Sequence, residues 1–215
     1  MATTTAQNNN AEYRMGLSDF DYMFRQIWPM AAVTGFNVAS DLATVRSHVA
    51  DAQVVIYCTN NQRICGTNDN DTGSNYTTAF TGVLTKLPTL SGNGTKASGD
   101  TPQAMLFIIT DGMRDELTGG TRYIGPIPTS QCTTIKNRGI RIAILNTRYL
   151  PESASDGWSI ANVRTPYLTP TDLITPALTA CASPGLFYQV TTDGDISAAL
   201  GTLFQTAVAS ARLTQ

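Results

Sequence analysis

Met105-Leu-Phe-Ile-Ile-Thr-Asp-Gly112 is the stretch of sequence that decides the fold. Its five apolar residues run without a break and end at Thr110, Asp111 and Gly112. An unbroken apolar run of this length predicts a parallel strand that is buried on both faces. Asp111 would then stand at the carboxyl end of a central strand, where open α/β sheets bind ligands. We expect Gly112 to turn the chain sharply and leave the carboxylate exposed at the rim, where it suits a hard cation such as Mg²⁺. A plain strand-ending turn is the competing interpretation.

Downstream of this strand, apolar strand patterns alternate with helical patterns. The predicted strands are Ile140–Leu145 and Leu186–Val190, and the predicted helices are Thr129–Asn137, Thr171–Ala180 and Asp195–Arg212. This alternation predicts an α/β fold with a mainly parallel, doubly wound sheet and right-handed crossovers. Upstream we expect a hairpin, two helices and a strand fragment: Glu12–Phe20 with Tyr22–Trp28, then Asp41–Val49, Val54–Tyr57 and Tyr76–Leu87.

Composition excludes several classes of partner. The 215 residues suit one domain better than two, and only 14% of them are charged, against roughly 25% in average soluble domains. A net charge of -2 without a run of Lys or Arg argues against nucleic acid as a partner. No apolar run has the length of a transmembrane helix, and residues 1–10 have no signal-peptide pattern.

Four cysteines occur, at Cys58, Cys65, Cys132 and Cys181. An even count is weak evidence for two disulfides, and three pairings are possible. Cys58 and Cys65 flank a short polar stretch, so a small loop could close between them and leave Cys132 to pair with Cys181. Free buried thiols are the alternative, whereas zinc is excluded by the spacing and by the distant position of His48 in the sequence.

Two further groups of polar residues are candidates for a site. Asp115 and Glu116 follow Asp111 closely, so the three acids could form a metal cluster, although helix-start or loop charges explain the latter two better. Ser74 precedes the predicted helix Tyr76–Leu87, where its hydroxyl could bind Mg²⁺ or merely cap the helix.

The sequence offers little for catalysis. Gly-x-Ser-x-Gly and P-loop patterns are absent, and no Gly-x-Gly-x-x-Gly follows a strand. His48 is the sole histidine and lies off the apolar stripe of its helix, which is typical of a surface histidine. Asp-x-Asp occurs at Asp19–Asp21 and Asp69–Asp71, neither of which follows an apolar strand. We therefore expect a protein that is not an enzyme.

An ordered set of segments resembles the von Willebrand factor A-like domain, and specifically the TadG-like proteins of the bacterial tight-adherence (Tad/Flp) pilus system. The resemblance covers most of the chain from Tyr13, and Thr-Asp-Gly by itself is common whereas the set is fairly specific. The segments are Tyr13–Leu17 with Phe20, Ser74–Phe80, Phe107–Met113, Cys132–Ile144 with Tyr149 and Pro151, Cys181–Pro184, and Asp195–Thr214.

This resemblance implies a Rossmann-like fold with a metal-ion-dependent adhesion site at the carboxyl edge of the sheet. Carried over to this chain, Asp111 and Ser74 match two of the family's ligand positions. The family's Asp-x-Ser-x-Ser motif is not found, which implies that Mg²⁺ is held weakly. The motif belongs before Tyr13, so we expect an amino-terminally truncated chain that lacks the first central strand, with residues 1–12 disordered or a remnant of the first helix and residues 13–215 forming the domain.

The resemblance also implies a role and a location. It predicts a non-enzymatic adhesion or assembly module of a bacterial pilus that binds a protein partner through its metal site. It further predicts an extracytoplasmic domain whose membrane anchor lies upstream of this chain. The alternative hypothesis is a Mg²⁺-dependent phosphohydrolase that uses Asp111, Asp115 and Glu116, and a third is a structural fragment without a site.

Overall fold

The protein is described by a computed structural model that covers residues 14–29, 38–52, 73–95, 97–191 and 194–212. The chain divides into two compact units, Met1–Ala79 and Phe80–Gln215, and each is described by itself. Residues 1–12, the predicted strand fragment Val54–Tyr57, Cys58 and Cys65 lie outside the described residues.

The amino-terminal unit contains the predicted hairpin and helix. Strands β1 (Leu17–Phe20) and β2 (Phe24–Trp28) pair antiparallel, and helix α2 (Val38–Ser47) is followed by the short 3-10 helix η1 (Val49–Asp51). Arg25 on β2 donates hydrogen bonds to Asp19 and Asp21, each 2.7 Å long, which tie the two strands together at the turn. His48 stacks on the Trp28 ring at 4.3 Å between centroids and lies 2.6 Å from an Asp51 oxygen. It is therefore partly packed rather than fully surrounded by solvent.

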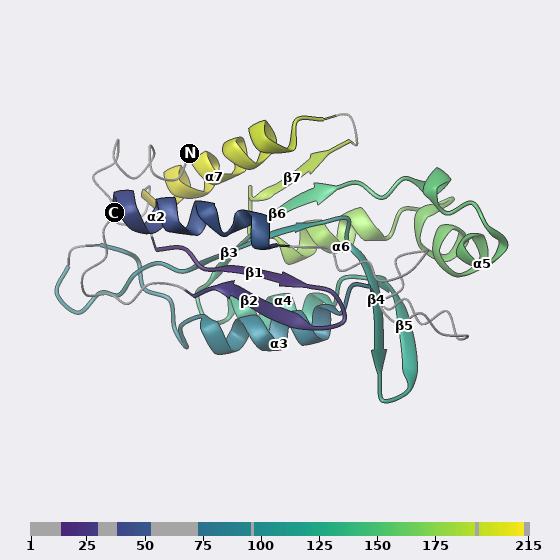
Figure 1. Ribbon diagram of the computed structural model, residues 1–215, viewed down its shortest axis with the longest axis horizontal. Coiled ribbons are helices and arrows are strands. Elements are labelled where there is room, and N and C mark those ends of the chain that lie inside the picture. The colour runs from purple at the N-terminus through teal and green to yellow at the C-terminus, as the bar shows by residue number, and fades with distance from the viewer. Residues whose placement is uncertain (1–13, 30–37, 53–72, 96, 192–193, 213–215) are drawn as a thin grey trace. The chain divides into compact units, whose positions relative to one another are not determined.

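A three-stranded parallel sheet forms the centre of the carboxyl-terminal unit (Figure 1). Its strands are β3 (Met105–Thr110), β6 (Arg141–Thr147) and β7 (Phe187–Val190), in the order β3-β6-β7. The parallel sheet and the α/β class are confirmed, because each of these strands lies within two residues of the segment that the sequence predicts.

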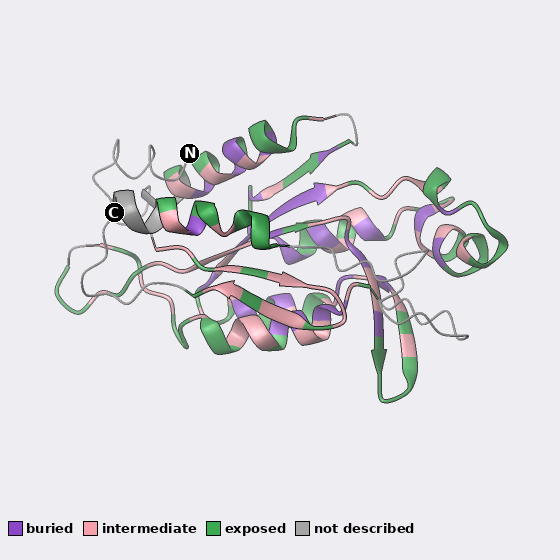
Figure 2. Ribbon diagram, viewed as in Figure 1, coloured by how far each residue is buried: buried purple, intermediate pink, exposed green. Residues whose placement is uncertain are grey.

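The prediction that Met105–Thr110 is the strand buried on both faces is wrong. The fully buried strand is β6, in which Ile142–Asn146 are all buried, as Figure 2 shows. β3 is the outermost strand of the sheet among the described residues, and Ile109 keeps 51% of its surface exposed. Burial depends on having a neighbour on each side, which an apolar sequence alone does not specify.

Helices cover both faces of this sheet (Figure 1). They are α4 (Thr129–Lys136), α6 (Ile174–Cys181) and α7 (Ile196–Arg212), while α3 (Tyr76–Lys86) begins in the amino-terminal unit. Leu203 and Ala207 of α7 pack with Ala143 and Leu145 of β6. Successive side chains of a strand alternate in direction, so Ile142 and Ile144 point to the opposite face, which α4 and α6 cover.

A second hairpin follows Gly112 directly and was not predicted. Strands β4 (Met113–Thr118) and β5 (Thr121–Pro126) pair antiparallel, and the hairpin extends away from the three-stranded sheet (Figure 1). β5 packs against a helical segment for which the sequence analysis gives no helix. That segment consists of η3 (Pro151–Ser153), α5 (Gly157–Ser159) and the π-helix η4 (Ile160–Leu168).

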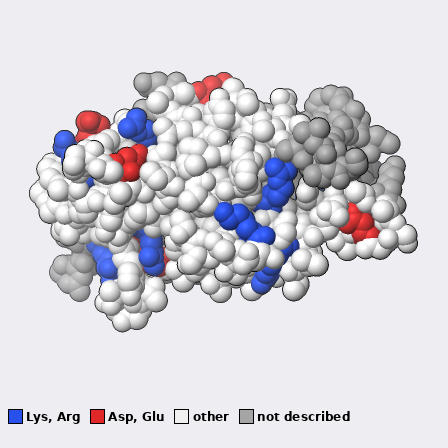
Figure 3. All heavy atoms as spheres, turned by 180° about the vertical axis from the view of Figure 1, so that it is seen from behind, with Lys and Arg blue, Asp and Glu red and all other residues white. Residues whose placement is uncertain are grey.

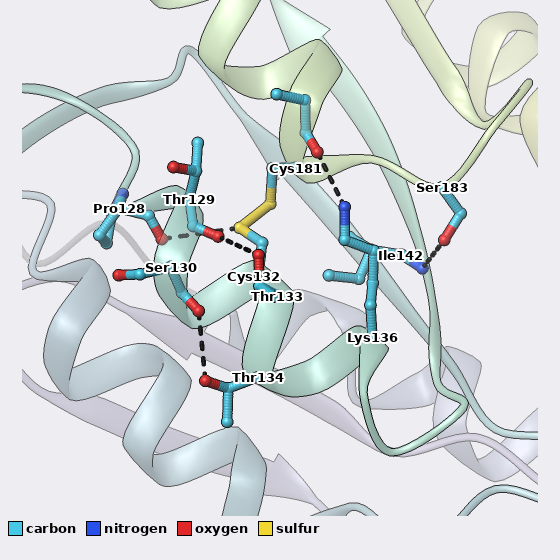
Figure 4. Close-up of a disulfide and its surroundings, with 11 residues drawn as sticks. Pro128, Thr129, Ser130, Cys132, Thr133, Thr134, Lys136, Ile142, Cys181 and Ser183 are labelled. Atoms are coloured by element: carbon cyan, nitrogen blue, oxygen red, sulfur yellow. Dashed lines mark hydrogen bonds between the residues drawn. A yellow bond between two sulfur atoms is a disulfide. The ribbon is translucent and has the colours of Figure 1, made fainter.

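A disulfide joins Cys132 of α4 to Cys181 at the end of α6 (Figure 4). Both cysteines are fully buried. Nearby, the Lys136 ammonium donates to the Ala180 carbonyl at 2.8 Å, and the Ser183 hydroxyl accepts from the Ile142 amide at 3.0 Å. The pairing left open between Cys132 and Cys181 is confirmed, and it locks two helices on one face of the sheet.

The surface carries few charges. On the face shown in Figure 3, uncharged residues form most of the surface, and the cationic and anionic side chains are scattered. Among the described residues, none of the helices has the length and apolarity needed to cross a membrane.

Candidate functional site

Asp111 lies where the chain leaves β3 at the carboxyl edge of the sheet. The Thr110 hydroxyl accepts a hydrogen bond from the Gly112 amide at 3.0 Å, and Asp111 Oδ1 accepts from the Met113 amide at 3.1 Å. Gly112 adopts a φ of 82°, which side chains rarely allow. This turn fixes the carboxylate at the edge that the sequence predicts.

The Asp111 carboxylate is half-buried, so the expectation that it stands exposed at the rim is wrong. Burial raises its pKa, and its two backbone hydrogen bonds, one with the Met113 amide and one with its own, oppose that rise only in part. Burial also raises the pKa of Tyr149, and the charges of Asp111 and Asp156 raise it further. In the part of the chain that the structure describes, no cationic side chain acts on the pKa of Asp111, and a bound cation would stabilise the charged carboxylate.

Helix α6 packs directly on the turn after Asp111. A β-carbon built on Gly112 would lie 2.5 Å from Leu178 Cδ1 and 2.7 Å from Ile174 Cγ2, closer than real side chains approach. The helix therefore confines the backbone next to Asp111 and contributes to its burial.

Asn146 is a residue of this edge that sequence analysis missed. It lies in register with Thr110 on β3 and Gln189 on β7, and only 1% of its surface is exposed to solvent. Its Nδ2 donates to Gln189 Oε1 at 3.0 Å, while its Oδ1 is buried and has no hydrogen-bond partner in the described part of the chain. The available signal was an asparagine at the end of an otherwise apolar strand, the same pattern that singles out Thr110-Asp111.

The first turn of α6 continues this polar row. Thr175 Oγ1 lies 3.4 Å from Gln189 Oε1 and donates to Asp172 Oδ2 at 2.6 Å. Asp172 also accepts from the amides of Ile174 and Thr175, so it caps the first turn of α6. Burial acts to raise the pKa of Asp172, but these hydrogen bonds and the charge of Arg148 hold it below its usual value.

Asp115 and Glu116 do not join Asp111. They are consecutive on β4 and therefore point to opposite faces of the hairpin. Arg122 binds both carboxylate oxygens of Asp115, at 2.8 and 2.7 Å, and the fully buried Glu116 pairs with Arg114. Their expected place in a loop or at a helix start is wrong. Among the described residues, no group of three His, Cys, Asp or Glu side chains is arranged to hold a metal.

Ser74 precedes α3, as predicted, with Asn75 between it and Tyr76, the first residue of the helix. Asn75, not Ser74, caps this helix, because its Oδ1 accepts from the Thr78 amide at 2.9 Å. The hydroxyl of Ser74 is thus not needed for capping. Ser74 belongs to the amino-terminal unit and Asp111 to the carboxyl-terminal unit, so their joint site stays a prediction.

Comparison with known proteins supports the fold. No protein-family model matches the chain, and no curated protein does. The chain is similar to a crystal structure of the conserved hypothetical protein BatB from Bacteroides thetaiotaomicron, with a TM-score of 0.51 and 14% sequence identity. The match covers 98% of this chain and 85% of the other. At this identity the likeness shows the fold, an α/β fold consistent with the von Willebrand factor A-like class.

Proposed function

We propose that this domain is a non-enzymatic protein-binding module, which acts in adhesion or in assembly of a bacterial Tad/Flp pilus. The observation that carries the proposal is the position of Asp111. It is a half-buried carboxylate at the carboxyl edge of a parallel sheet, and within the described residues no cationic side chain is among the groups that set its pKa. Such an edge is where ligands bind in open α/β sheets.

In the proposed mode of binding, Asp111 and Ser74 supply oxygen ligands to Mg²⁺. Carboxylate and hydroxyl oxygens suit this hard cation, and Asn146 Oδ1, which is buried and has no hydrogen-bond partner among the described residues, adds a further acceptor at this edge. An acidic side chain of the partner would complete the coordination. The domain's own residues hold the cation and orient it toward the partner.

The disulfide supports the proposed location. Disulfides persist in oxidising compartments, so Cys132–Cys181 favours an extracytoplasmic domain. An anchor that holds the full-length protein at the membrane is part of the same proposal.

Calorimetric titration with Mg²⁺ and Mn²⁺ tests the proposed site. We expect saturable binding by the wild type, loss of binding in Asp111→Asn, weaker binding in Ser74→Ala, and unchanged binding in Asp115→Asn. Asp115→Asn is the matched control, since it removes a carboxylate that Arg122 already occupies. Absence of heat from the wild type at millimolar ion would contradict the proposal.

The phosphohydrolase hypothesis has its own test. Because Arg122 and Arg114 occupy Asp115 and Glu116, these acids are poorly placed to share a metal with Asp111. Mg²⁺-dependent turnover of a generic phosphoester that disappears in Asp111→Asn would favour the enzyme instead.

A further inference from the structure

The buried amide of Asn146 is only half satisfied. Its nitrogen donates to Gln189, but its Oδ1 is buried without a donor in the described part of the chain. Buried acceptors in native proteins are nearly always hydrogen-bonded, so an unsatisfied one indicates a further partner such as a water or an ion. Arg114 Nε and Gln131 Oε1 are also unsatisfied, but neither belongs to a strand end of the parallel sheet.

The direction of the Asn146 oxygen follows from its neighbours. β6 lies between β7 and β3, and the register places Gln189 on one side of Asn146 and Thr110 on the other. The nitrogen arm of the planar amide points at Gln189, so the oxygen arm points away from β7. The oxygen therefore faces β3, where Asp111 follows Thr110. Neighbouring strands lie about 5 Å apart, so the backbone positions of Asn146 and Asp111 are adjacent at this edge of the sheet.

Residues in the first turn of helix α6 pack over that edge. Ile174 approaches Gly112, which is bonded to Asp111, and Thr175 approaches Gln189, which holds Asn146. One helical turn thus covers both the carboxylate's turn and the amide's partner.

We propose that Asn146 supplies a second oxygen ligand, beside Asp111, to a hard divalent cation at this edge. The inference rests on the proposed function, because it concerns the same cation. A neutral amide oxygen is a normal ligand for Mg²⁺, Mn²⁺ or Ca²⁺, and it adds coordination without adding charge. Both residues belong to the carboxyl-terminal unit, so this pair forms part of the site without Ser74.

Mn²⁺ titration, followed by electron paramagnetic resonance of the free ion, separates a ligand from a structural amide. Asn146→Leu removes the oxygen and should weaken binding by about tenfold or more, whereas Asn146→Asp adds a charged oxygen and should strengthen binding by about tenfold. A merely structural asparagine would not yield a gain with Asp. Asn137→Asp is the matched control, since it adds the same charge at an exposed position on the far end of α4, and we expect no change.

The outcomes distinguish this inference from the proposed function. Wild-type affinity in both Asn146 variants, with each variant folded by its NMR spectrum, would overturn the ligand role of Asn146 alone. If the wild type binds no Mn²⁺, the proposed function fails. In that case, binding gained by Asn146→Asp and lost again with Asp111→Asn would still support the pair, and no gain would overturn it.

Discussion

Leu178 on α6 and Gly112 after β3 are in such close contact that the helix surface leaves no space for a side chain at residue 112. A β-carbon there would lie 2.5 Å from Leu178 Cδ1. The backbone beside Asp111 is thus fixed from two sides, by the strand that it leaves and by the helix above it.

Gly112→Ala should therefore destabilise the protein strongly. The positive φ costs about 1–2 kcal/mol for alanine, and overpacking against Leu178 adds about 1–3 kcal/mol. Urea unfolding of Gly112→Ala and of Gly99→Ala measures the difference. Gly99 has a similar φ of 85°, but no atom beyond its chain neighbours lies within 4 Å of an added β-carbon. Equal losses in the two variants would show that α6 does not press on Gly112.

Asp111→Asn should stabilise the fold at neutral pH. The folded state raises the pKa of Asp111 above 3.8, so it favours the neutral carboxyl group. The wild type accordingly has its full stability contribution from this group below pH 3.8 and loses it as the pH rises through the folded pKa. Asparagine carries no charge and can still accept the Met113 hydrogen bond.

Unfolding at pH 7 and at pH 3 tests this expectation, with the exposed Glu152→Gln as control. The advantage of Asp111→Asn over wild type should be present at pH 7 and largely vanish at pH 3. A variant that is less stable than wild type at pH 7 would show that the carboxylate charge serves the fold rather than a ligand.

Removal of the disulfide should cost several kcal/mol. Cys132 and Cys181 are 49 residues apart, and chain-entropy estimates for a loop of this size give about 4 kcal/mol. Unfolding of a Cys132→Ala/Cys181→Ala variant measures the loss. Tryptic digestion without reductant should yield peptide 123–136 linked to peptide 165–212. Recovery of the two peptides unlinked would contradict the bond.

Asp100 should titrate at a pKa of about 2, far below 3.8. Its carboxylate accepts from the Thr95 hydroxyl at 2.6 Å and from the amides of Asn93, Thr95 and Thr101. The stability that these bonds provide is present above pH 3.8 and is lost as the pH falls toward 2. Carboxyl NMR titration of wild type and Thr95→Val checks this, because removal of the hydroxyl should raise the pKa of Asp100. An unchanged value would show that the hydroxyl bond is not formed.

Local sequence patterns were sufficient to predict the elements that are defined by their own apolar residues. β6, β7 and α7 were predicted within a few residues, since apolar runs and helical spacing define them. Asp195 caps α7 by accepting a hydrogen bond from the Ala198 amide at 2.9 Å. The position of Asp111 at a strand end was also predictable, because Thr-Asp-Gly closes an apolar run.

Tertiary context decided the rest. The hairpin β4–β5 was missed because Met113–Thr118 contains three charged residues, which is not typical of a strand. In the structure Glu116 is fully buried and pairs with Arg114, and Asp115 pairs with Arg122, so the strand accommodates these charges. The sequence predicts that β3 is central, but the exposure of a strand depends on which strands lie beside it, and β3 has a partner only in β6 among the described residues. Asn146 ends an apolar run, which is a signal in the sequence, but only the register shows that it lies between Thr110 and Gln189.

The tip of the β4–β5 hairpin is a suitable position for a label. The hairpin begins after Asp111 and returns at Pro126, which pairs with Met113, so its two strands are joined at the base. Its tip at Gly119 and Gly120 is exposed, and added β-carbons there meet nothing within 4 Å. A fluorophore or an affinity tag inserted at these two glycines would be carried several residues away from the sheet edge, and would allow the proposed cation binding to be measured without a change at Asp111 or Asn146.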